Sequence, residues 1–469
     1  MDNQKNDLFN INQNLINNII LHLDKNIIFN DEYTTNLKLL ITDLLSEEAL
    51  SYSTNYMKRF VNIFKKIMKN YKTFNLKLNV FDKREADTKN NEYVLLSNIF
   101  NCKFIIKIIS DEKNNCIIEH NCSKFISKNI IYLDICPHFV LYINNIEIQD
   151  KYFYNYYLNN NNNMALVYHY INPLKININD SYYKISNLTD LINYFDENKY
   201  NYQQTFLDEV FLNIFFQIIY SICTLSKYRI NHNDLRQSNI LIHGNYIQNT
   251  YDTYKVINNG EETIYYVKNL GFKVKIIDFG LMNSDKIDIL NNPNSFNHKM
   301  INEAGLFKFY SEYYDIHYVL NDILFNNKIK SISPKVHSLL NNIINEKYLG
   351  PHKVNKYVNQ YWRLSIPYTI KEYSEKYNFS ELYPDFKLNY DENNNLIIDD
   401  VIKTTMINHI ESLSEEKVTN SILTNIIDPL DNNLDKILKP YEALKLFDYF
   451  TDKPEDIKII NNYILDLSN

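Results

Sequence analysis

The spacing of apolar residues changes along the chain and divides it into regions. Residues 1–75 carry apolar positions at helical spacing in short pieces. Residues 76–171 instead contain five short runs rich in β-branched and aromatic residues, with one helix-like stretch after Lys113, behind the third run. The pattern therefore predicts a helical N-terminal segment, then five strands with a helix between the third and the fourth.

A long buried helix is predicted after Thr205, where apolar residues recur three and four positions apart. These are Phe206, Leu207, Val210, Phe211, Ile214, Phe215, Ile218, Ile219 and Ile222. Thr205 followed by Asp208 resembles a capping box, so we expect the helix to begin there.

Beyond this helix the pattern predicts two short strands, NILIHG and KVKIIDFG, separated by a polar insert. Asn259-Gly260 inside the insert is typical of a two-residue hairpin turn. A second buried helix is predicted over 313–325, and from Ser331 to the end the periodicity is mainly helical. We therefore divide the chain into segments 1–75, 76–171, 172–330 and 331–469.

Composition excludes several classes of protein. The 469 residues are 45% hydrophobic and 22% charged, which is enough for a sizeable core and about two to four structural units. The net charge is −7 and no long basic block occurs, so we expect no nucleic-acid partner. The basic amphipathic stretch Met57–Lys72 is interpreted as a solvated helix, with a membrane or nucleic-acid role as the alternative.

Targeting and redox signals point to an intracellular, cytoplasmic protein. No apolar run approaches the ~18–20 residues of a membrane span, and the acidic, Asn-rich N-terminus is unlike a signal peptide. Five Cys are too few for a disulfide framework. Cys116, His120 and Cys122 lie close together, but no second pair follows at zinc-ligand spacing, so we interpret them as thiols rather than a zinc site.

Three oxygen-bearing side chains are the candidates for chemistry. NHNDLRQSNI supplies Asp234 and Asn239 on a short loop between the long helix and a strand, and KIIDFG supplies Asp278 at the end of the neighbouring strand. Gly280 is expected to let the chain turn sharply after this carboxylate. Carboxylate and amide oxygens suit Mg²⁺, and transfer of a phosphoryl group needs a carboxylate beside the acceptor hydroxyl. The alternative for Asp234 and Asn239 is a polar turn that ends a helix.

These residues resemble the catalytic loop and the metal-binding DFG triplet of protein kinases, in the right order and each next to a strand. The resemblance implies an α+β fold with a small β-rich N-lobe, a larger mainly helical C-lobe and a helical N-terminal extension. Asp234 would be the catalytic base, Arg236 would place positive charge near the γ-phosphate, and Asn239 and Asp278 would hold Mg²⁺, with Mn²⁺ possible. Asp315, in the first turn of the helix over 313–325, would brace the catalytic loop.

The resemblance extends upstream. CKFIIKII resembles the third kinase strand, so Lys107 would contact the ATP phosphates, paired with Glu119 or alternatively Glu112. LVYHYINP resembles the strand that meets adenine, with Tyr168 in the gatekeeper place and backbone groups from His169, Tyr170 and Ile171. An exposed strand-edge lysine, a surface glutamate and ordinary strand residues are the alternatives.

Several kinase features are missing. The first glycine in the chain is Gly244, so the phosphate-covering segment, expected over Glu92–Phe100, contains none. Asn233 stands where kinases carry the arginine that reads a phosphorylated activation loop, and no APE triplet follows DFG. With these departures the chain resembles divergent serine/threonine kinases of large nucleocytoplasmic DNA viruses, of the poxvirus and giant-virus types, which would place it in the host cytoplasm or the virion.

The resemblance implies an ATP- and Mg²⁺-dependent protein kinase acting on Ser/Thr hydroxyls of an unidentified protein substrate. A pseudokinase scaffold that binds a partner protein or ATP without turnover is one alternative. A kinase-fold enzyme for a small-molecule hydroxyl is another, because acceptor choice lies in loops.

Overall fold

The computed structural model describes a large part of the chain, in blocks. They are residues 80–84, 92–99, 102–110, 115–147, 163–178, 181–244, 248–290, 310–351, 358, 361–364, 371, 374–375, 378–390, 396–397, 399–412 and 437–468. The predicted N-terminal helical segment 1–75, with Met57–Lys72, lies outside them.

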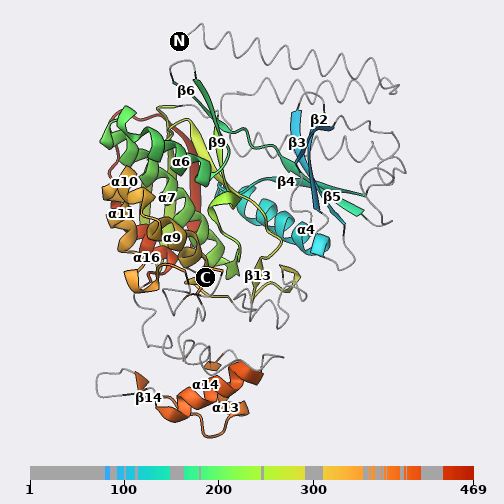
Figure 1. Ribbon diagram of the computed structural model, residues 1–469, viewed down its shortest axis with the longest axis vertical. Coiled ribbons are helices and arrows are strands. Elements are labelled where there is room, and N and C mark those ends of the chain that lie inside the picture. The colour runs from blue at the N-terminus through green and yellow to red at the C-terminus, as the bar shows by residue number, and fades with distance from the viewer. Residues whose placement is uncertain are drawn as a thin grey trace.

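A five-stranded antiparallel sheet occupies the first described region (Figure 1), with the strand order β1-β2-β3-β5-β4. The helix α4 follows the third strand, so the predicted order of five strands and one helix is confirmed. Glu92–Phe100, expected to cover phosphates, contributes the strand β2 between β1 and β3, and the β1–β2 connection lies outside the described residues. The bounds are β1 Val80–Arg84, β2 Glu92–Ile99, β3 Cys102–Ser110, α4 Asn115–Ile126, β4 Tyr142–Glu147 and β5 Asn163–His169.

Helices make up most of the second described region, on the left of Figure 1, where they surround the long helix α7. Mixed helix and strand content confirms an α+β chain. The bounds are α6 Leu188–Asn198, α7 Gln204–Lys227, α9 Tyr314–Phe325, α10 Lys328–Ile332, α11 Pro334–Asn341 and α16 Pro440–Lys445.

The predicted capping box at Thr205 was wrong. Helix α7 already begins at Gln204, and its N-cap residue Gln203 makes no side-chain cap. Asp208 instead accepts hydrogen bonds from the Gln204 amide, at 2.9 Å, and from the Ser333 hydroxyl, at 2.5 Å. The carboxylate therefore ties α7 to the start of α11, a contact that local sequence spacing does not reveal.

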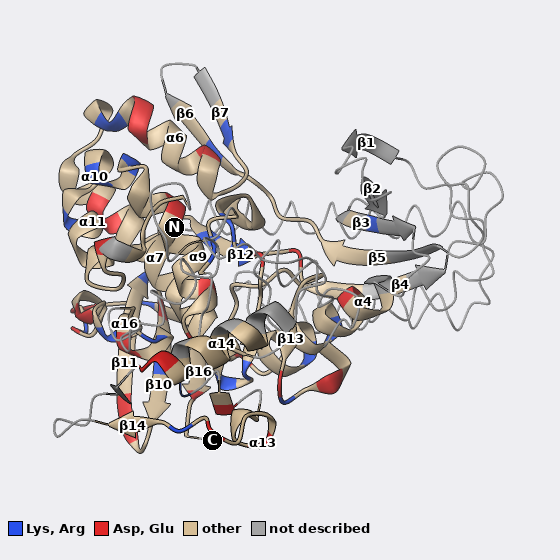
Figure 2. Cartoon of the chain, turned by 60° about the horizontal axis from the view of Figure 1, so that its bottom comes forward, with Lys and Arg blue, Asp and Glu red and all other residues tan. Residues whose placement is uncertain are grey.

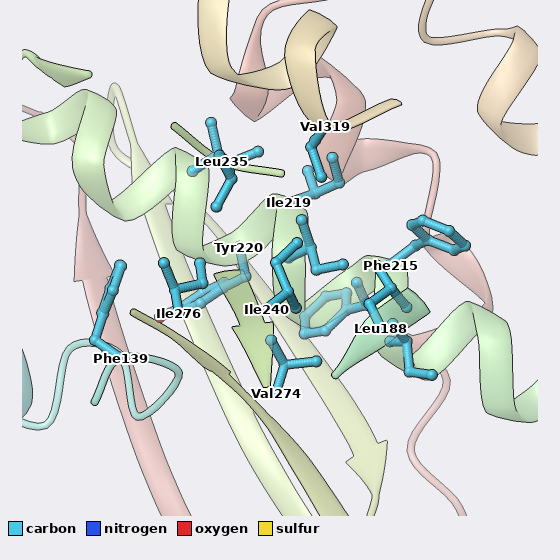
Figure 3. Close-up of a cluster of buried hydrophobic side chains, with 14 of the residues drawn as sticks. Phe139, Leu188, Phe215, Ile219, Tyr220, Leu235, Ile240, Val274, Ile276 and Val319 are labelled. Atoms are coloured by element: carbon cyan, nitrogen blue, oxygen red, sulfur yellow. The ribbon is translucent and has the colours of Figure 1, made fainter. Parts of the chain in front are cut away.

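Contrary to the expectation that no apolar run approaches the length of a membrane span, helix α7 is long and apolar enough by composition to cross a membrane. Its most apolar window is 83% buried inside the protein. Figure 3 shows why: Phe215, Ile219 and Tyr220 of α7 lie among apolar side chains of the neighbouring elements. The core of the molecule therefore surrounds this helix.

Short strand pairs connect the helices. The predicted hairpin around Asn259-Gly260 is confirmed, with both turn residues at positive φ. The pairs are β8 Ile230–Asn231 with β13 Asn283–Ser284, β9 Ile240–Gly244 with β12 Phe272–Ile276, β10 Tyr251–Asn258 with β11 Glu261–Lys268, and β6 Leu174–Ile178 with β7 Ser181–Ile185.

The prediction of a helical remainder over 331–469 needs correction. Strand β16 (Ile459–Asp466) runs parallel to β10 and completes a three-stranded sheet. Its alternate residues Tyr463 and Leu465 are buried, which is the period-2 pattern of a half-buried strand. The described residues of this segment also include the helices α13 Phe379–Leu382 and α14 Asp400–Ser412 and the strands β14 Asn389–Tyr390 and β15 Leu396–Ile397.

Charged side chains are mixed over the described elements. In the view of Figure 2, Lys and Arg lie interspersed with Asp and Glu over the helices. Among the described elements, residues of both charge signs are therefore intermixed, and the basic stretch Met57–Lys72 lies outside them.

Candidate active site

The loop that carries Asp234 is held in place by one buried carboxyl group. Asp315, in the first turn of α9 and 1% exposed, accepts a hydrogen bond from the His232 backbone N–H at 2.6 Å and another from the Asn233 N–H at 3.0 Å. The neighbouring Leu235 is fully buried and belongs to the same apolar cluster as Val319 of α9 (Figure 3). The loop is thus fixed by its own backbone and by apolar packing.

Asp278 follows β12 with its backbone in the left-handed region, at φ 68°. Asn and Asp tolerate this region better than most residues. Gly280 is not among the positive-φ glycines of the described residues, so the sharp turn expected there is made at Asp278. A side chain added at Gly280 would come within 3.5 Å of Glu119 Oε2. That distance is an ordinary van der Waals contact, so the space beside α4 does not by itself require a glycine here.

Asn239 and Asp278 are brought close to each other by the pairing of β9 with β12. The backbone N–H of Ile277 donates to the Asn239 carbonyl oxygen at 3.0 Å. His232 Nε2 donates to the Ile277 carbonyl oxygen at 2.9 Å, and its ring packs edge-on against Phe279. The two predicted metal residues and the loop of Asp234 therefore belong to one hydrogen-bonded unit.

Lys107 reaches this unit from the five-stranded sheet. Its Nζ lies 2.8 Å from Glu119 Oε2 and 3.2 Å from Asp278 Oδ1. Tyr168 donates its hydroxyl hydrogen to the other oxygen of Glu119, at 3.1 Å, and lies 2.9 Å from Ser123 Oγ. The structure thus brings together Lys107, Glu119 and Asp278. The alternative Glu112 lies outside the described residues.

Asp234 is contacted through both oxygens of its carboxyl group. Oδ2 accepts from Asn239 Nδ2 at 2.9 Å and lies 3.4 Å from Arg236 Nε. Oδ1 accepts from Arg363 at 3.1 Å. Sequence reasoning missed Arg363, since it lies 129 residues away and no motif surrounds it.

The electrostatics of Asp278 and Asp315 differ. Burial works to raise the pKa of Asp278, but the nearby Lys107 ammonium, with His232 and Arg236, holds it below the usual value. Burial raises the pKa of Asp315, although its hydrogen bonds partly oppose that shift. Asp278 is therefore the carboxyl group that stays ionised more readily, as a cation ligand must.

The chain directly after Gly280 is anchored by unmodified side chains. Asn233, which stands in place of the phosphate-reading arginine, donates at 2.8 Å both to the Leu281 carbonyl oxygen and to Asn283 Oδ1. Arg229 makes a two-pronged ion pair with Asp285, with Nε 2.6 Å from Oδ1. No phosphate is needed for these contacts.

The predicted adenine contacts lie where β5 ends. The backbone N–H of His169 donates to the Leu141 carbonyl oxygen at 3.0 Å, so this group is already used within the protein. The side chain of Ile171 is buried and that of Tyr170 is partly exposed. The carbonyl of His169 and the backbone of the next two residues remain the predicted contacts.

The donor set fits Mg²⁺. Asn239 uses its amide nitrogen on Asp234, which leaves its side-chain oxygen to face a cation, and Asp278 adds a carboxylate that is 37% exposed. Within the described blocks no cluster of three His, Cys, Asp or Glu side chains forms a ready metal site. Two protein oxygens are a typical set for Mg²⁺, which takes its other ligands from phosphates and water.

Two of the three side chains weighed as zinc ligands, those of Cys122 and His120, make contacts within the protein. Cys122 is buried and donates to the Leu290 carbonyl oxygen, and His120 bonds the Tyr142 hydroxyl at 2.7 Å. These two side chains connect α4 to its surroundings.

Comparisons with known proteins add little. No protein-family model matches the sequence, and no curated protein matches it. Among solved structures, a crystal structure of a kinase domain from Plasmodium is similar: 17% of residues are identical, the match covers 79% of this chain and 95% of that chain, and the TM-score is 0.35. At this level of similarity we rest the proposal below on contacts within this chain.

Proposed function

We propose that this chain has a protein-kinase-like fold and is an ATP- and Mg²⁺-dependent kinase that phosphorylates Ser/Thr hydroxyls of proteins. One observation carries the proposal: Lys107 Nζ lies between Glu119 and Asp278, at 2.8 and 3.2 Å. A lysine on a central strand that had no role in phosphate binding would be an unusual partner for two carboxylates from distant elements. This arrangement is what phosphate binding beside a metal-binding aspartate requires.

Each residue then has a chemical task. Asp234 orients the acceptor hydroxyl and takes up its proton, while Lys107 holds the phosphates of ATP. Asn239 and Asp278 hold Mg²⁺, which neutralises charge on the phosphates when bound. Arg236, whose side chain is 58% exposed, supplies positive charge at the edge of the site. The fixed loop of Asp234 supports in-line geometry, because positioning provides much of the rate in phosphoryl transfer.

The contacts that follow Gly280 also favour an enzyme that is ready without modification. Asn233 and Arg229 hold that segment directly through Asn283 and Asp285. A kinase of the large-DNA-virus type would need no activating kinase under this proposal. Under this proposal, access to the protein substrate, and not phosphorylation of the kinase itself, would determine when transfer occurs.

The test is transfer of labelled γ-phosphate from ATP to the protein itself and to generic protein acceptors. Asp234→Asn and Asp278→Asn should each lower the rate by about 10²-fold or more. Asp196→Asn is the matched control, because this carboxylate pairs with Lys199 on the surface of α6 and should leave transfer unchanged.

Three outcomes separate the alternatives. Equal transfer by the wild type and Asp234→Asn would contradict the proposal. Thermal stabilisation by ATP and Mg²⁺ without transfer would instead identify a binding module. Transfer to small hydroxyl compounds but not to proteins would identify a small-molecule kinase.

A further inference from the structure

Arg363 is built into the site from a part of the chain that no sequence motif points to. Its guanidinium donates to Asp234 Oδ1 at 3.1 Å and lies over the ring of Tyr318, 4.6 Å from the ring centre. The Arg363 side chain is 7% exposed, whereas that of Arg236 is 58% exposed. The Arg363 side chain is therefore enclosed by the protein, whereas that of Arg236 lies largely in solvent.

The backbone directly before Arg363 adopts an unusual conformation. Trp362 has φ 64°, a left-handed conformation that is rare for a bulky residue and costs about 1–3 kcal/mol. The carbonyl oxygen of Trp362 accepts from Asn321 Nδ2 at 3.0 Å, and its ring packs edge-on against Phe325. Asn321 also binds the backbone of Gly350 in both directions. Helix α9 thus offsets the strain and aims the next residue at Asp234.

The two oxygens of the Asp234 carboxyl group have different partners. Asn239 and Arg236 approach Oδ2, and Arg363 approaches Oδ1. With both oxygens held, the carboxyl group cannot rotate about its Cβ–Cγ bond. Each carboxylate oxygen has two acceptor sites, so Oδ1 can bind Arg363 and still accept a hydrogen bond from an acceptor hydroxyl.

The guanidinium group of Arg363 stays protonated in this position. Burial works to lower its pKa, but the neighbouring phenols and the Asp234 carboxyl group raise it above the usual value. A permanent positive charge beside the proposed base also offsets the negative charge that two carboxylates and the ATP phosphates bring together.

We propose that Arg363 is a positioning residue for Asp234: it fixes the carboxyl group in the orientation that receives the acceptor hydroxyl. This rests on the proposed kinase function. The geometry makes residues 361–364 part of the acceptor side of the site, supplied by the chain beyond α9. The effect belongs to the transfer step and leaves ATP binding untouched, because the contact is with the base and not with Lys107 or Asp278.

The experiment compares Arg363→Ala, Arg363→Gln and Arg363→Lys with the wild type in the full-length protein. We expect Arg363→Ala to lower kcat about 10²-fold with an unchanged KM for ATP, since small misplacements of a reacting group cost about this much. Arg363→Gln should also be slow, and Arg363→Lys should recover part of the rate. Added guanidinium ion at low millimolar concentration should partly restore Arg363→Ala.

Lys335→Ala is the matched control, because it also removes a cation from a tyrosine ring, that of Tyr449, without touching Asp234. It should leave kcat unchanged. Thermal melting of every variant, with and without ATP and Mg²⁺, identifies loss of folding, and a variant that melts early is replaced by Arg363→Gln or Arg363→Lys in the comparison.

Four results would overturn the inference. Full kcat in folded Arg363→Ala would remove the positioning role, and a loss confined to the KM for ATP would assign Arg363 to nucleotide binding. A higher kcat in Arg363→Ala would mean that the arginine blocks the base in the resting protein. No transfer by the wild type would instead refute the kinase function and this inference with it.

Discussion

The two sides of the candidate site are held by different kinds of contact. The loop of Asp234 is fixed through its backbone: the N–H groups of His232 and Asn233 both bind Asp315. The ammonium group of Lys107 is instead placed by contacts with two side chains, those of Glu119 and Asp278. A backbone contact sets the path of the chain, whereas a side-chain contact can open without moving any strand. The base side is therefore rigid, and the lysine side is the one able to adjust when phosphates enter.

Asp315→Ala should cause the largest loss of folding stability, because it removes the acceptor of two buried N–H groups. Each unsatisfied group costs about 1–3 kcal/mol, so the free energy of unfolding should fall by about 2–6 kcal/mol. Phosphate transfer should be lost with it, since the loop of Asp234 loses its shape. Urea denaturation and the transfer assay measure both.

Asp322→Ala, on the same helix, is the control for Asp315→Ala. Asp322 accepts from the Gln237 side chain, at 2.5 Å, so its loss should cost less than about 1.5 kcal/mol. If both variants lose equal stability, the loop is not braced by Asp315 and the contrast between the two sides disappears.

Lys107→Met should have an intermediate effect on stability and a large effect on transfer. The buried Glu119 carboxyl group loses its ion-pair partner but keeps the Tyr168 hydroxyl, so we expect a loss of about 2–3 kcal/mol, below the usual cost of breaking a fully buried pair. Transfer should fall by about 10²-fold because the phosphates lose their cation. Denaturation and steady-state kinetics test both values.

Tyr168→Phe is the companion variant, since it keeps the ring and removes the hydroxyl that donates to Glu119. Its cost should be about 1 kcal/mol. A Lys107→Met variant as unstable as Asp315→Ala would show that the lysine side is as rigid as the base side.

The smallest expected effect is on the acid dependence of stability. The pKa of Asp278 is lower in the folded protein than in the unfolded chain, so its contribution is fully present above about pH 4 and is lost as the pH falls through the folded pKa. Asp278→Asn should therefore lose less stability than the wild type between about pH 5 and pH 2. Urea midpoints measured across this range test the slope.

Asp315 should behave in the opposite sense. Its pKa is raised by folding, so it contributes stability at low pH that is lost as the pH rises through the folded pKa. Asp315→Asn should therefore lose stability more steeply than the wild type on acidification. Equal slopes in both variants would contradict the assignment of opposite shifts to the two carboxyl groups.

Much of the local structure was predictable because it is decided by neighbours in sequence. Short runs rich in β-branched and aromatic residues predicted the five strands, and Asn259-Gly260 predicted the hairpin turn. The sequence also pointed to Lys107, Glu119 and Asp278, which the structure brings together, although their roles stay predictions. The start of α7 was missed, because Asp208 is used in a contact with Ser333 that lies far along the chain.

What the sequence by itself determined is the set of chemical groups and the elements that carry them: a carboxylate and an amide on one loop, a carboxylate after a strand and a lysine within another. What only the tertiary structure decided is which groups meet. Strand β16 pairs with β10 from the far end of the chain, and Arg363 reaches Asp234 across 129 residues. Local propensity contains no information about such contacts, because they depend on how α7 and α9 pack and on where the buried Asn321 holds the backbone.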